Sequence, residues 1–282
     1  MCRFIAFYFE RERVDALSKI IDALVEASSN DPYLGKLASD TRHCHGFGYV
    51  LALNVHGSWR IMFEKGDYDD CERNLRALKN AAEKVKRAIK EGEKGFLIIH
   101  ARRTSREPRG PLNAHPFTYV RLLDQGKMIF FFAQNGGVRK EDISNNLNVP
   151  PELFTDTFLA LAYIATKVKK PNDVIEMLKS AMKFTYSKSA FNTALLCVMN
   201  IKRKDILRLY ITAYYGDDVR RSQIRMNYYQ AYLVREDGLI GYIPSTVKDI
   251  LHFSNIGLKI EKMNDRIIEI SEDGIIINDI KI

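Results

Sequence analysis

The sequence lacks the patterns that would indicate a disulfide-rich domain, a zinc ribbon or a membrane protein. Its four cysteines lie at positions 2, 44, 71 and 197 and show no paired spacing, so no disulfide framework and no zinc ribbon is expected. No apolar run approaches the roughly 20 residues that a transmembrane helix needs. The charged stretch 10–13 ends the apolar N-terminus too early for a signal peptide. We therefore expect a soluble, cytoplasmic protein that does not bind membranes.

Internal repeats, low-complexity tracts and Ser/Gly linkers are also missing from the 282 residues. This length allows one large domain or two small ones, and without a linker we expect residues 1–282 to form one domain. Lysine and arginine total 43 against 35 acidic residues, which gives a net charge of +8. The basic residues are scattered over stretches such as 72–94 that also carry glutamates, so nucleic-acid binding is not expected.

The hydrophobic pattern predicts an α+β fold. Strands are expected first, then helices, then strands again, an order that favours helices covering two stacked, largely antiparallel sheets in four layers. The ranges 29–45 and 103–118 are expected to be loops. Expected helices span 12–28, 70–92, 156–169, 172–184 and 246–252. Expected strands span 1–9, 49–55, 58–65, 96–99, 128–133, 191–201, 206–215, 228–235, 239–243, 257–262, 266–270 and 274–281.

Cys2 directly follows the initiator methionine and precedes an apolar strand. Methionine is usually removed before so small a residue, which would place a thiol and a free α-amine on Cys2. With reference pKa values of roughly 8.5 for the thiol and 7.7–8.0 for the amine, the amine can act as base and the thiol as nucleophile. The alternative is an ordinary buried cysteine.

Three expected strands end in polar groups suited to chemistry on a small amide: Cys2, His100 with Arg102, and Asn135 with Gly136. Arg102 can bind a carboxylate through two N–H groups. The Asn135 amide and the Gly136 N–H can stabilise an oxyanion. Asp156, at the start of an expected helix, can accept from a substrate ammonium.

Each of these residues also has a structural interpretation. Asp156 with Thr155 could be a helix N-cap, Asn135-Gly136 a turn, Arg102 a surface ion-pair partner and His115 a loop residue. His43-Cys44-His45 could supply a pair of metal ligands, but no third or fourth ligand stands at a recognisable spacing, so no metal and no cofactor is expected.

Taken in order, these motifs resemble the class-II glutamine amidotransferases, a branch of the N-terminal nucleophile hydrolases. The resemblance covers roughly residues 1–160 and rests on six short motifs: Met1-Cys2-Arg3-Phe4, Gly46-Phe47-Gly48, His100 to Ser105, Asn113 to Phe117, Asn135-Gly136-Gly137 and Thr155-Asp156-Thr157. It implies an αββα sandwich that the late strands, about 190–282, complete.

The resemblance also implies roles for single residues. Cys2 would attack the side-chain amide of glutamine and form a thioester, with Asn135 and Gly136 as the oxyanion hole. Arg102 would bind the substrate α-carboxylate and Asp156 its α-amine. The motif positions His100, Ser105 and His115 would lie beside the substrate.

The chain departs from the family pattern at Arg103 and at Arg106-Glu107. Together with Arg109, these arginines could face a second, acidic substrate or a partner. No synthase domain follows, so the resemblance is to the standalone type, with a separate synthase subunit or another ammonia acceptor. The alternatives are hydrolysis of a different γ-glutamyl amide, or a catalytically silent binding protein that keeps the fold.

Overall fold

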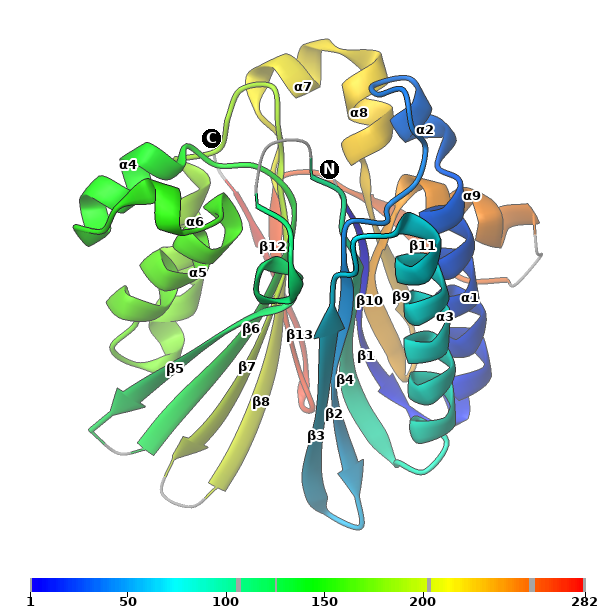
Figure 1. Ribbon diagram of the computed structural model, residues 1–282. Helices are drawn as coiled ribbons and strands as arrows, with labels where there is room; N and C mark the ends of the chain where they lie inside the picture. The colour runs from blue at the N-terminus through cyan, green and yellow to red at the C-terminus, as the bar shows by residue number, and fades with distance from the viewer. Residues whose placement is uncertain (1, 105–107, 125, 202–203, 254–256, 281–282) are drawn as a thin grey trace.

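The computed structural model describes residues 2–104, 108–124, 126–201, 204–253 and 257–280. Within these ranges two antiparallel sheets stack face to face (Figure 1). The first sheet contains, in spatial order, β11 (Ile260–Met263), β9 (Ala231–Glu236), β10 (Leu239–Pro244), β1 (Arg3–Glu10), β4 (Lys94–Ala101), β2 (Phe47–Val55) and β3 (Ser58–Gly66). The second contains β13 (Gly274–Asp279), β12 (Arg266–Ser271), β8 (Lys204–Ala213), β7 (Phe191–Ile201), β6 (Gly126–Gly136) and β5 (Phe117–Leu123).

Helices cover the outer face of each sheet (Figure 1). The first sheet carries α1 (Val14–Ser29), α3 (Cys71–Ala88) and α9 (Ser245–Phe253), and the second carries α4 (Lys140–Leu147), α5 (Asp156–Lys167) and α6 (Val174–Met182). Short helices α2 (Pro32–Gly35), α7 (Asp217–Arg221) and α8 (Gln223–Tyr229) lie at the end of the sandwich near the N-terminus. The four-layer αββα arrangement predicted from the sequence is confirmed.

The alternation of side chains along β1 explains why this strand is apolar throughout. Phe4, Ala6 and Tyr8 belong to the core between the two sheets. Ile5, Phe7 and Phe9 face the other way and pack with α1, α3 and α9. Because successive residues of a strand point to opposite faces, a strand covered on both sides needs apolar residues at every position.

Strand register brings the start of β1 to the end of β4. The two strands are antiparallel with Arg3 opposite Ala101, so Cys2 lies beside the residues that follow Ala101. Strands from both halves of the chain share each sheet. The assignment of 1–282 to one domain remains a prediction. Among the described helices, none is both long enough and apolar enough to cross a lipid bilayer.

Several elements differ from the sequence-based expectations. Strand β5 begins inside the expected loop 103–118, and α4 was not expected. Residues 228–229 end helix α8 rather than starting a strand, although their aromatic side chains favour strands by propensity. Tertiary packing decides here, because Tyr228 and Tyr229 are buried in the core between the sheets.

A disulfide joins Cys44 to Cys71, which corrects the expectation drawn from the cysteine spacing. Cys44 precedes β2 and Cys71 begins α3, 27 residues later in the chain. The β2–β3 hairpin between them returns the chain, so the two Cα atoms are 5.0 Å apart. The pair therefore arises from the fold and has no signature in local sequence.

Candidate active site

Cys2 is buried at the start of β1, and contacts from three parts of the chain fix its position. Its backbone N donates to Asn135 Oδ1 at 3.0 Å, and its thiol donates to the Arg103 carbonyl at 3.6 Å. Tyr228 Oη donates to the Cys2 carbonyl at 3.2 Å. Asn135 lies at the end of β6 and Arg103 follows β4. The ends of strands from both sheets therefore converge on Cys2, as the sequence predicts.

A buried polar network anchors the neighbouring residue, Arg3. Its guanidinium pairs with Asp31 at 2.6 Å and donates to the Tyr228 carbonyl and to Thr246 Oγ1, at 2.8 and 3.0 Å. Asp31 also accepts from Thr246 and lies 2.9 Å from His43 Nε2. Arg3 and Asp31 are fully buried. Because removal of one partner would leave a buried charge unpaired, this network holds the start of β1 firmly.

The surroundings of Cys2 favour its thiolate. Burial alone raises the pKa of the thiol, but the positive charge of the chain N-terminus and the proximity of His100 outweigh burial and lower the pKa to about 6. Most Cys2 side chains are therefore ionised at neutral pH, and the thiolate is the nucleophilic form of cysteine. In contrast, burial raises the pKa of Cys197, the other free cysteine of the described residues.

Asn135 and Gly136 end strand β6 directly opposite Cys2. Asn135 Nδ2 is buried and has no hydrogen-bond partner among the described residues, which is unusual for a buried donor. Gly136 has φ of +143°, and a Cβ there would lie 1.7 Å from the Ala190 carbonyl oxygen, so only glycine fits. Asn135 and Gly136 do not form a turn, because both residues pair with strand β7.

A cavity of about 400 Å³ opens beside Cys2. Its lining carries charges of both signs. Besides Cys2 the lining comprises Arg102, Arg103, Thr104, His115, Gln134, Gly136, Val138, Lys140, Glu141, Thr155, Asp156, Thr157 and Tyr186. The predicted residues Cys2, Arg102, Gly136, His115 and Asp156 thus share one cavity, and Asn135 lies against Cys2.

Asp156 is the first residue of α5, and Thr155 is the N-cap, because its hydroxyl accepts from the Phe158 N–H at 3.2 Å. The Asp156 carboxylate instead accepts from the N–H groups of Val138 and Thr157, at 3.2 and 2.7 Å. It therefore bridges the end of β6 to the helix start.

Arg102 is 3% exposed and is not a surface residue. Its guanidinium donates to the Pro108 carbonyl at 3.0 Å.

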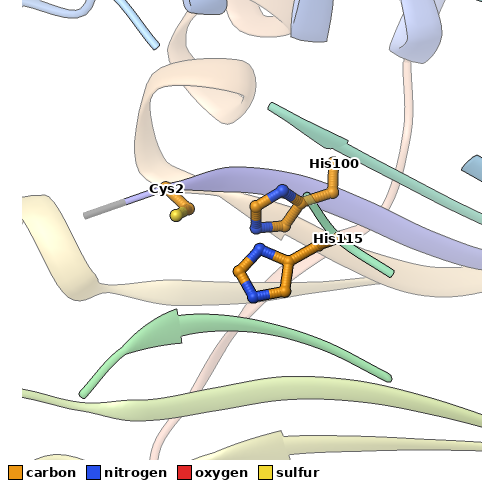
Figure 2. A group of neighbouring side chains, drawn as sticks. All are labelled: Cys2, His100 and His115. Carbon is orange, nitrogen blue, oxygen red and sulfur yellow. The ribbon is translucent and has the colours of Figure 1, made fainter. Parts of the chain in front are cut away.

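His100 and His115 lie next to Cys2 (Figure 2). Their ring centroids are 4.1 Å apart, and His115 precedes a cis peptide bond to Pro116. Burial, followed by the proximity of His100 and Arg102, holds the pKa of His115 well below its ordinary value. Nδ1 of His100 and both ring nitrogens of His115 have no hydrogen-bond partner in the described part of the chain. Cys2, His100 and His115 together form a possible ligand group for a metal ion.

Two of the arginines considered for a second substrate, Arg103 and Arg109, have partners within the protein. Arg103 pairs with Asp40 at 3.3 Å and donates to the Arg42 carbonyl, although it also lines the cavity. Arg109 pairs with Asp67 at 2.7 Å. Ser105 and Arg106 lie outside the described residues.

The sequence did not single out five residues of the lining: Gln134, Val138, Lys140, Glu141 and Tyr186. Gln134 directly precedes Asn135 and could have been included with that motif. Lys140 and Glu141 belong to α4, whose helix was not predicted. Tyr186 carries no local signal, because it reaches the cavity only through the tertiary fold.

Comparison with known proteins gives no match to a family model and no match among curated sequences. Solved structures do match. Glutamine phosphoribosylpyrophosphate (PRPP) amidotransferase from B. subtilis, complexed with ADP and GMP, aligns with 100% of this chain at a TM-score of 0.58 and 11% identity. This chain has the fold of one half of a PRPP amidotransferase.

A second structure, of the allosteric regulatory enzyme of purine biosynthesis, aligns with 99% of this chain at a TM-score of 0.56 and 11% identity. The alignments include 50% and 49% of the two larger chains, so this chain spans about half the length of each. At this identity the likeness shows the fold alone, and the sandwich of N-terminal nucleophile hydrolase type expected from the sequence is confirmed.

Proposed function

We propose that this protein hydrolyses the side-chain amide of glutamine through a Cys2 thioester, releasing glutamate and ammonia for a separate acceptor. The observation that carries the proposal is the placement of the low-pKa thiol of Cys2 against Asn135, at a cavity that both Arg102 and Asp156 line. The fold shared with one half of a glutamine PRPP amidotransferase supports the same reaction class.

The first half of the reaction forms the thioester. After loss of Met1, the α-amine of Cys2 takes the thiol proton, and Sγ attacks the amide carbon of glutamine. Negative charge develops on the amide oxygen, where the unpartnered Nδ2 of Asn135 and the N–H of Gly136 stabilise it. One such donor typically lowers the barrier by about 2.7–4 kcal/mol. The intermediate then expels ammonia, which receives its proton from the α-ammonium group.

The second half consumes water. The neutral α-amine removes a proton from a water molecule, whose oxygen attacks the thioester carbon. Collapse of this second intermediate breaks the C–S bond, releases glutamate and restores the Cys2 thiolate with its ammonium group. The same two donors, Asn135 Nδ2 and the Gly136 N–H, stabilise the oxyanion in both halves of the reaction.

Arg102 and Asp156 are proposed to hold the amino-acid end of glutamine. A guanidinium binds a carboxylate through two parallel N–H bonds, and the Asp156 carboxylate is suited to the α-ammonium group. Such charge pairing fixes the amide carbon next to Sγ, and holding reactants in place accounts for much of enzymatic rate enhancement. His115 lines the cavity beside Cys2, and His100 packs against His115.

The acceptor of the ammonia is proposed to be a separate synthase subunit or a small molecule, and the reaction is expected in the cytoplasm. Hydrolysis of another γ-glutamyl amide is the second candidate, because such a compound carries the same α-carboxylate and α-amine that Arg102 and Asp156 would bind.

The test compares purified protein with two variants, Cys2→Ser and Cys2→Ala, in glutamine hydrolysis. Ammonia release by the unaltered protein and a loss of several orders of magnitude in both variants are expected. Cys197→Ser, which removes the other free buried thiol, should retain activity. Assays with γ-glutamyl anilides alongside glutamine compare the two candidate substrates by kcat/KM. Turnover near that of the unaltered protein in Cys2→Ala refutes the mechanism, and no turnover of either substrate favours a silent binding protein.

A further inference from the structure

Three side chains that can bind a metal lie close together beside the cavity: Cys2, His100 and His115 (Figure 2). One donor atom from each lies within 4.8 Å of the other two, and all three residues are buried. We propose that they form a zinc(II) site whose occupation reversibly blocks the Cys2 thiol. Zinc ligation needs no turnover, so this proposal does not rest on the proposed function.

The donors have the chemistry that zinc prefers. One thiolate and two imidazoles are borderline-soft ligands typical of zinc. Nδ1 of His100 and both nitrogens of His115 have no hydrogen-bond partner among the described residues, so a metal would satisfy buried polar atoms that the protein itself leaves unused. Binding forms bonds to zinc from Sγ and from the two imidazole lone pairs, and any proton still on the thiol goes to solvent, with no change in oxidation state.

Removal of Met1 supplies a fourth donor. The α-amine of the new N-terminus and Sγ belong to one residue, so together they close a five-membered chelate ring with the metal. The α-ammonium group releases one proton to solvent so that the amine lone pair can bind zinc. The Cys2 nitrogen lies 3.0 Å from Asn135 Oδ1, which can accept one of the remaining N–H groups. The complete set of one sulfur and three nitrogens suits a tetrahedral ion.

The donor atoms lie within 4.8 Å of one another, so the cluster must close further to bind one ion. Zinc bonds of about 2.3 Å to sulfur and 2.0–2.1 Å to nitrogen imply donor separations of roughly 3.3–3.7 Å in a tetrahedron. The positive charges of Arg102 and Lys65 near His115 oppose a divalent cation. We therefore expect weaker binding than at closed structural zinc sites.

The other ligand group in the sequence, His43-Cys44-His45, is not available for zinc. Cys44 forms a disulfide with Cys71, and His43 Nε2 contacts the Asp31 carboxylate at 2.9 Å. Of these two histidine–cysteine groups in the described ranges, the group of Cys2, His100 and His115 is therefore the one whose side chains can bind zinc.

The test measures zinc protection of Cys2 on protein whose loss of Met1 has been verified by intact mass. Zinc chloride is titrated, iodoacetamide is added briefly, and alkylation of Cys2 is quantified in the N-terminal peptide. One equivalent should protect Cys2, and a chelator should restore its reactivity. Cobalt(II) provides a second readout, because a sulfur-to-cobalt charge-transfer band appears only if a thiolate is a ligand, and Cys2→Ala should abolish it.

Variants identify the histidines. His115→Gln and His100→Gln should each raise the zinc concentration for half-protection at least tenfold, while His56→Asn, at an exposed turn, should leave it unchanged. Thermal melting checks that each variant is folded. Failure of zinc to protect Cys2, or equal protection in His115→Gln, His100→Gln and His56→Asn, overturns the proposal. Protection without glutamine hydrolysis leaves the zinc site in place and counts against the proposed function alone.

Discussion

The ion pair between Arg3 and Asp31 provides a stability prediction that can be worked out from the structure. Arg3→Met removes a guanidinium that is fully buried and makes three hydrogen bonds, to Asp31, the Tyr228 carbonyl and Thr246. Methionine fills similar volume, so the cavity term is small. The Asp31 carboxylate, also fully buried, keeps its hydrogen bonds from Thr246 and the helix α2 backbone but loses its charged partner.

Leaving one partner of a buried ion pair alone costs roughly 3–5 kcal/mol, so we expect the free energy of unfolding to fall by about 3–5 kcal/mol. Urea denaturation followed by circular dichroism measures it. Arg266→Met is the matched control, because Arg266 pairs with Asp279 on the surface and such pairs contribute about 0–1 kcal/mol. An Arg3→Met loss no larger than that of Arg266→Met would refute the claim that this network anchors the start of β1.

Other predictions concern the thiol, the oxyanion hole and the disulfide. The Cys2 alkylation rate, measured in Cys197→Ser protein, should rise with pH through a midpoint near pH 6. Because the pKa of Cys2 is lower in the folded protein, the stability contributed by the thiolate is present above the unfolded pKa and is lost as the pH falls through 6. A midpoint near pH 8.5 would contradict the surroundings assigned to Cys2. Asn135→Ala should lower kcat for glutamine about 10²–10³-fold with little change in KM, measured by ammonia release, and an unchanged kcat would remove Asn135 from the oxyanion hole. Replacing Cys44 and Cys71 by serine should reduce the free energy of unfolding by about 3–4 kcal/mol for a loop of this length; a loss below 1 kcal/mol in urea denaturation would show that the bond does not constrain the unfolded chain.

Local patterns were sufficient to predict the sandwich and the meeting point of its strands. Strands such as 96–99 and 128–133 are continuously apolar, which indicates burial on both faces, and each ends in polar residues. Because such buried strands end at the sheet edge, their terminal polar groups gather there. The structure accordingly places Asn135 3.0 Å from the Cys2 nitrogen and Arg102 in the same cavity.

Features that depend on distant segments were not predictable in this way. The Cys44–Cys71 disulfide requires the return of the β2–β3 hairpin. The Arg3 network joins residues more than 200 positions apart. Helix α8 forms from residues with strand propensity because its aromatic side chains reach the core. The disulfide and the Arg3 network have no signal in the local sequence. In α8, tertiary packing overrides the local strand propensity.

The most direct test of the central claim is intact mass spectrometry of the purified protein, before and after treatment with a glutamine analogue that carries a thiol-alkylating group. We expect loss of one methionine and a single adduct, which peptide mapping places on Cys2, and we expect excess glutamine to slow adduct formation. Retained Met1 with no adduct, or an adduct on another residue that glutamine does not slow, would contradict a glutamine-binding cavity built around an N-terminal nucleophile.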